Sequence, residues 1–101
     1  MRNVLYIGRN DCPACVTLYN EVVAQLETKY PANVTSHVSW DEAIARVNAR
    51  KEIDNIPLFV VENGGEEEFR FFGRLDAEQI EGIVAYEGET LTLDDVLGGG
   101  L

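Results

Sequence analysis

The stretch VLYIGRNDCPACV, residues 4–16, decides the fold of this chain. Its first four residues, Val4 to Ile7, favour β structure and are closed by Gly8, which predicts a short buried strand. A polar loop follows, and Pro13 then suits the first turn of a helix, where its missing N–H costs nothing. Apolar residues continue at helical spacing until Pro31 ends the helix. These residues are Val16, Tyr19, Val22, Val23, Leu26 and Tyr30.

Two further elements are predicted beyond Pro31. Residues 34–40 alternate in polarity and carry β-branched side chains, so they predict a second strand. Ser39 and Glu42 form an S-x-x-E capping pattern, which predicts the start of a second helix.

The second half of the chain predicts a hairpin and a last helix. Residues 56–61 form the most apolar stretch and predict a central strand. An Asn-Gly-Gly turn signal at 63–65 joins it to a predicted partner strand at 67–72. Asp76 and Gln79 repeat the capping pattern and predict the start of a last helix. The predicted order of elements is therefore β-α-β-α-β-β-α.

Length and charge limit what the chain can be. With 101 residues it is expected to form one domain, which we place at 1–87, followed by an acidic, glycine-rich tail at 88–101 whose apolar residues can add a short element. The formal net charge of −10 argues against nucleic acid and anionic membrane surfaces as partners. The apolar run at 4–7 is too short for a secretory signal, so a reducing, cytoplasmic location is expected.

The chemistry is expected at the C-x-x-C pair, Cys12 and Cys15. Cys12 stands where the predicted helix begins, so unpaired backbone N–H groups and the positive end of the helix dipole face its sulfur. They favour the thiolate over the thiol, and the thiolate is the attacking species in disulfide exchange. Cys12 is therefore the predicted nucleophile, and Cys15 is predicted to resolve the mixed disulfide.

A C-x-x-C pair can also bind a metal, form a structural disulfide or belong to a protein without catalytic activity. A mononuclear zinc site needs four ligands, and beyond the two cysteines the chain offers only His37 and carboxylates. A structural disulfide across so small a loop would stabilise little. A metal or iron–sulfur cluster shared across a dimer is one alternative to redox catalysis. A non-catalytic protein-binding module is another.

With strand, C-x-x-C and helix in this order, the chain resembles the thioredoxin superfamily. Ile56-Pro57 matches the position of that superfamily's cis-proline loop. The resemblance implies an α/β thioredoxin fold with three layers around a four-stranded mixed sheet. It also implies that Pro57 stacks against the cysteine pair and that the backbone of Ile56 binds an extended substrate.

Part of the resemblance is to glutaredoxins, which implies glutathione as a co-substrate. The short start before the first strand and Pro13 in a C-P-x-C motif are similar to that family, whereas Ala14 replaces the tyrosine usual there. Arg9 matches a basic residue that binds a glutathione carboxylate. Gly73 and Asp76 match part of a Gly-Gly-x-Asp-Asp segment, although the second glycine and second aspartate are missing. Asp76 is explained equally well as a helix cap.

The activity implied is reduction of protein disulfides or of glutathione mixed disulfides by a monomer with no bound cofactor. Electrons would come from glutathione or from a flavoprotein thioredoxin reductase, and the residues leave both donors open. A disulfide-containing protein such as ribonucleotide reductase is the substrate class that the family suggests.

Overall fold

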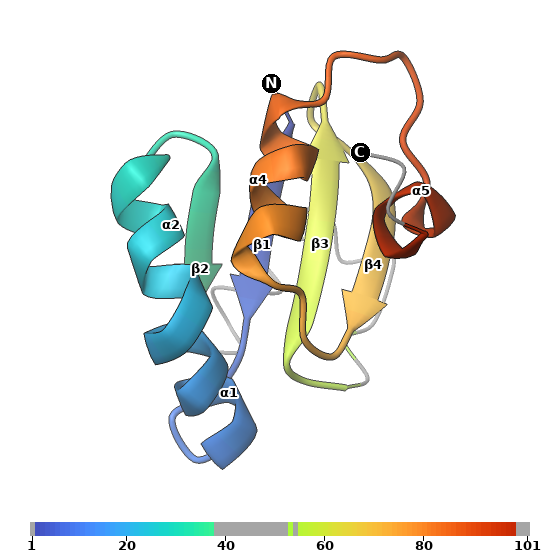
Figure 1. Cartoon of the computed structure of the whole chain (residues 1–101). Coiled ribbons are helices and arrows are strands. Elements are labelled where there is room, and N and C mark those ends of the chain that lie inside the picture. Colours follow the sequence, from blue (N-terminus) through green and yellow to red (C-terminus); the bar gives the residue numbers. More distant parts are fainter. Residues whose placement is uncertain (1, 38–52, 54, 99–101) are drawn as a thin grey trace.

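The computed structural model describes residues 2–37, 53 and 55–98. Its centre is a four-stranded mixed sheet in the order β2-β1-β3-β4 (Figure 1). The strands are β1 (Asn3–Ile7), β2 (Val34–His37), β3 (Leu58–Asn63) and β4 (Glu66–Phe72). β1 runs parallel to β2 and antiparallel to β3, and β4 is antiparallel to β3. The predicted mixed sheet and the predicted central strand are therefore confirmed, although the strand begins at Leu58 and not at Ile56.

The two central strands are apolar at residues 4–7 and 58–61 because both faces of the sheet are buried there. Alternate side chains of a strand point to opposite faces, so a strand covered on both sides has no polar face. The larger core cluster takes Val4 and Tyr6 from β1 and Phe59 and Val61 from β3. A smaller cluster on the other face contains Leu5, Ile7, Leu58 and Val60.

The long helix begins at Pro13 as predicted and has three consecutive parts. They are α1 (Pro13–Leu18), η1 (Tyr19–Val23), which is a π-helix, and α2 (Ala24–Lys29). The helix ends just before Pro31, because a residue that precedes proline is disfavoured in the helical region. The π-helical part was not predicted.

The buried face of this helix differs from the prediction at one position. Cys15, Leu18 and Val22 form the buried row, whereas Val16, predicted on that face, is 39% exposed. Val16 follows Cys15 directly and is therefore rotated about 100° around the helix axis, away from the sheet. The cysteine, and not the valine, is the first core residue of the helix.

The hairpin follows the turn signal in the sequence. β3 starts at Leu58, after a cis peptide bond between Ile56 and Pro57. Gly64 and Gly65 join β3 to β4 with φ angles of 63° and 85°, in the left-handed region where glycine carries no steric penalty. The predicted cis bond and the predicted hairpin are confirmed.

Two helices complete the described chain. α4 (Ala77–Ala85) begins with the predicted capping box, in which the Asp76 N–H donates to Gln79 Oε1 at 2.9 Å. It lies beside α2 on one face of the sheet (Figure 1). α5 (Leu93–Leu97) is the short element expected in the tail. In the described ranges, no helix is long and apolar enough to cross a membrane. The helix predicted from the Ser39–Glu42 pattern lies outside the described residues, as does the predicted second strand beyond residue 37.

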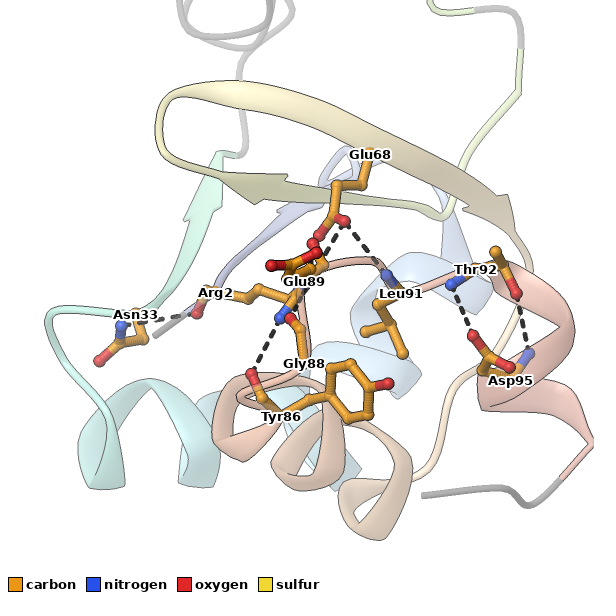
Figure 2. Close-up of polar contacts among 9 residues, drawn as sticks. All are labelled: Arg2, Asn33, Glu68, Tyr86, Gly88, Glu89, Leu91, Thr92 and Asp95. Atoms are coloured by element: carbon orange, nitrogen blue, oxygen red, sulfur yellow. Dashed lines mark hydrogen bonds and ion pairs between the residues drawn. The ribbon is translucent and has the colours of Figure 1, made fainter.

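Arg2 connects the segment after α4 to the sheet by hydrogen bonds (Figure 2). Its guanidinium donates to both carboxylate oxygens of Glu68 on β4 and to the backbone oxygens of Tyr86, Gly88 and Glu89. Glu68 also accepts a hydrogen bond from the Leu91 N–H at 3.3 Å. Arg2 is only 2% exposed, and Leu91 and Val96 belong to the larger core cluster. The segment after α4 is therefore packed onto the sheet.

Candidate active site

The two cysteines form a disulfide at the end of β1. Cys12 caps α1, Cys15 lies one turn later, and their Cα atoms are 5.2 Å apart. Cys15 is buried, at 2% exposure, whereas Cys12 is half-buried and Pro13 and Ala14 are exposed. The outer sulfur is thus the one that a partner molecule can reach.

The backbone of the first turn is directed at the sulfur of Cys12. Its Sγ accepts a hydrogen bond from the Cys15 N–H at 3.2 Å. In the reduced protein the same donor would face a thiolate, and a hydrogen bond to a charged acceptor is stronger than one to a neutral acceptor. The structure thus places one backbone donor against Cys12 Sγ, and the role of Cys12 as the nucleophile stays a prediction.

The charges next to Cys12 are paired with each other. Arg9 Nη2 and Asp11 Oδ2 are 2.7 Å apart, and both side chains are well exposed. The loop itself is closed by a hydrogen bond from the Cys12 N–H to the Arg9 carbonyl oxygen at 3.2 Å. An exposed ion pair of this kind contributes little to stability.

Pro57 and Gly73 lie at the same end of the sheet as the cysteines. Leu58 stands opposite Ile7 on one side and Phe72 on the other, which places all three strand ends together. The Gly73 N–H donates to the Pro57 carbonyl oxygen at 3.0 Å. Ile56 and Pro57 are half-buried, and Phe72 is 57% exposed beside them. A partly apolar surface thus lies at the end of the sheet where β1 leads into the cysteine loop.

The residues predicted to bind glutathione lie on two sides of β1. Arg9 lines a pocket that reaches Ser36 of β2, whereas Gly73 and Asp76 follow β4. Arg74, which follows Gly73, forms ion pairs with Glu21 at 2.7 Å and with Asp76 at 3.4 Å. The structure brings Gly73 into contact with Pro57, whereas Arg9 lines the pocket on the β2 side of β1.

Two residues beside Cys15 were not predicted as site residues. Tyr6 donates its hydroxyl hydrogen to the Cys15 carbonyl oxygen at 2.6 Å, and Gly8 lies against the Cys15 side chain. Both line a pocket of about 270 Å³ together with Cys15. One signal could have indicated Tyr6: a tyrosine in an apolar strand brings a hydroxyl into the core, where it needs a partner.

Comparison with known proteins identifies the fold. No protein-family model and no curated protein sequence matches the chain. Among solved structures, thioredoxin from Fasciola hepatica is 24% identical, covers 85% of this chain and 81% of its own, and superposes with a TM-score of 0.61. Mitochondrial thioredoxin 3 from Saccharomyces cerevisiae, in its oxidised form, is 19% identical over 84% and 78% of the two chains, with a TM-score of 0.62. The chain has the thioredoxin fold, and its C-x-x-C pair forms a disulfide at the start of the first helix.

Proposed function

We propose that this protein is a thiol–disulfide oxidoreductase in which Cys12 attacks a substrate disulfide and Cys15 resolves the intermediate. The observation that carries the proposal is the unequal placement of two bonded cysteines. Cys12 can be reached from solvent and faces a backbone donor at 3.2 Å, whereas Cys15 is 2% exposed. An accessible, stabilised thiolate with a second thiol within bonding distance is what disulfide exchange requires.

The proposal extends to the location, oligomeric state and substrate of the protein. The protein works in the cytoplasm as a monomer without a bound cofactor and reduces disulfides of a protein such as ribonucleotide reductase. The net charge of −10 supports a partner with a basic docking face and no binding to nucleic acid or anionic membranes. Ile56 and Pro57 would contact the substrate, since they precede β3 at the end of the sheet where β1 leads into the cysteine loop, and Pro13 would contact it from the helix.

Two electron donors are compatible with this proposal, glutathione and a flavoprotein thioredoxin reductase. Glutathione is supported by the C-P-x-C motif and by Gly73 and Asp76, which lie on one flank of the site. A flavoprotein thioredoxin reductase is supported by the likeness of the fold to thioredoxins. Arg9 would assist glutathione binding only if the ligand spans both flanks of β1.

A paired reductase assay on the wild type and on Cys15→Ser tests the proposal. Insulin reduction is followed with thioredoxin reductase, and reduction of a glutathione mixed disulfide is followed with glutathione. Turnover of insulin that is abolished in Cys15→Ser establishes a dithiol reductase of the thioredoxin type. Glutathione-dependent turnover that survives in Cys15→Ser establishes a glutaredoxin type, because the nucleophile alone completes that reaction.

Inactivity in both assays would refute the enzyme proposal. A stable complex with a protein partner would then favour a binding module that uses the surface beside Pro57. Metal analysis and an absorption spectrum of freshly purified protein would identify a zinc-bridged or iron–sulfur-bridged dimer.

A further inference from the structure

Tyr6 places a buried hydroxyl next to the second cysteine. The side chain is 3% exposed, and its ring packs against Phe59 and Tyr19 with centroid distances of 5.2 and 6.4 Å. Its hydroxyl donates to the Cys15 carbonyl oxygen at 2.6 Å, and the bond is itself buried. A buried hydroxyl must find a partner, and here the partner is the backbone of the resolving cysteine.

The same carbonyl oxygen also belongs to the helix. It accepts a hydrogen bond from the Tyr19 N–H, which is shared with the Val16 carbonyl oxygen. Tyr19 is the first residue of the π-helical part η1, and such π segments occur often at functional sites. The Cys15 peptide is therefore held by β1 as well as by its own helix.

Gly8 brings these groups into close contact. A methyl group at Gly8 would lie 2.9 Å from Cys15 Cβ, 3.3 Å from Cys15 Sγ and 3.2 Å from the Tyr6 hydroxyl oxygen. Because no side chain fits there, the strand end approaches the cysteine directly. Tyr6, Gly8 and the helix together leave Cys15 little freedom to turn away from Cys12.

We propose that Tyr6 is a positioning residue that holds Cys15 toward Cys12 during resolution of the mixed disulfide, an inference that rests on the proposed function. In the first step the Cys12 thiolate attacks the substrate disulfide, a Cys12–substrate bond forms, and one substrate thiolate leaves. In the second step Cys15, having released its proton to solvent, attacks Cys12 Sγ. The Cys12–Cys15 bond forms, the Cys12–substrate bond breaks, and its electron pair leaves with the second thiolate. Two electrons pass from the protein to the substrate.

The ionisation of Tyr6 fits a positioning role and not that of a base. Burial raises the pKa of Tyr6 to about 12. The hydroxyl therefore stays protonated where thiols react, near the pKa of about 8.5 of a free cysteine. It remains a hydrogen-bond donor to Cys15 throughout that range and does not take up the thiol proton.

Tyr6→Phe, with Tyr19→Phe as control, tests the proposal in a single turnover. Both tyrosines line the same pocket, but the Tyr19 hydroxyl donates to Glu27 Oε1 at 3.2 Å and not to an active-site residue. The reduced protein is mixed with the symmetric disulfide of a single-cysteine peptide, and samples are quenched in acid. Mass spectrometry then counts released peptide and protein–peptide mixed disulfide.

Tyr6→Phe should release the first peptide at the wild-type rate and the second about tenfold more slowly, a factor typical of one lost hydrogen bond. The mixed disulfide should accumulate in this variant and not in Tyr19→Phe. Release of both peptides at wild-type rates by Tyr6→Phe would overturn the positioning role. Failure of the wild type to release either peptide would instead refute the proposed function.

Gly8→Ala gives a second test that does not depend on Tyr6→Phe being folded. Its methyl group would lie 2.9 Å from Cys15 Cβ, so Cys15 or the end of the strand must shift, and the same second release should slow. Near-ultraviolet circular dichroism establishes that each variant is folded. A folded Gly8→Ala that resolves the mixed disulfide as fast as the wild type would equally contradict the proposal.

Discussion

Asp76 combines a helix cap with a position beside the candidate active site. It precedes α4 and joins Gln79 in a capping box, while its carboxylate also approaches Arg74 Nε at 3.4 Å. The side chain is exposed, so the ion pair with Arg74 contributes little to stability. The cap needs an oxygen acceptor, whereas binding of the glutathione ammonium group would need the negative charge. One residue can therefore be tested for the two roles separately.

Asp76→Asn should leave the free energy of unfolding nearly unchanged, because asparagine caps helices about as well as aspartate. Asp76→Ala should lower it by about 1 kcal/mol, since the cap is lost. Urea unfolding of both variants measures this difference. If Asp76 binds glutathione, Asp76→Asn will also raise the KM for glutathione. Equal stability losses in both variants would show that the charge, and not the cap, stabilises α4.

At the scale of elements, the sequence predicted those parts that depend on local signals. The strand at 4–7, the helix from Pro13, the hairpin turn and the cap at Asp76 are each encoded within a few residues. The π-helical part was missed because residues 19–23 show no pattern that separates it from an α-helix. The pairing of Arg2 with Glu68 was missed because it joins residues 66 positions apart.

Glu68 shows how an irregular strand creates a contact. Val61 pairs with Phe69 and Glu62 pairs with Glu67, so Glu68 is an extra residue in β4 without a partner across the strand. Such a bulge redirects a side chain, and here it lets Glu68 reach Arg2. The hydrogen bond from Arg2 is the main reason that the pKa of Glu68 lies below its usual value.

Glu68→Gln should lower the free energy of unfolding by about 2 kcal/mol at neutral pH, since a charge-assisted bond is lost. Because the pKa of Glu68 is lower in the folded state, its stabilisation is present above the unfolded pKa of about 4.3 and is lost as the pH falls through the folded pKa. The difference between wild type and variant should therefore shrink toward about pH 3. Urea unfolding at both pH values measures it.

Glu66→Gln is the control for this pH dependence. Glu66 opens the same strand, and its side chain is exposed. Its replacement should leave the acid dependence of unfolding as it is in the wild type. A constant difference between wild type and Glu68→Gln across the pH range would contradict the assigned role of the Arg2–Glu68 pair.

The motif residues of the candidate site could be predicted from the sequence, whereas the contacts that surround them could not. Cys12, Cys15 and Pro57 were predicted from motif and position, because their spacing relative to the elements is local. The structure confirms the cysteine pairing and the cis bond, whereas the roles of the three residues stay predictions. The contact of Tyr6 with Cys15 was not predicted, because the hydroxyl finds the Cys15 carbonyl oxygen only when the strand and the helix pack together. At the scale of the molecule, supporting contacts are set by packing and not by motif.

The division of the chain into a domain at 1–87 and a tail at 88–101 stays a prediction that one side chain can test. Leu91 is 2% exposed and lies in the core cluster with Ile80 and Ile83, whereas Leu97, in the same segment, is 49% exposed. Leu91→Ala should lower the free energy of unfolding by about 3 kcal/mol, because it leaves a cavity in the core. Leu97→Ala should change it by less than about 0.5 kcal/mol.

Urea unfolding of the two leucine variants, followed by circular dichroism and tryptophan fluorescence, measures the contrast. A large loss in Leu91→Ala that appears in both signals would mean that the segment folds with the domain, held there by Arg2 and Glu68. The boundary at residue 87 would then be wrong, because a chain cut there would lose part of its own core. Equal, small effects of the two substitutions would mean that residues 1–87 fold without the segment. The Arg2–Glu68 pair would then hold the segment against the domain without adding to the stability of residues 1–87.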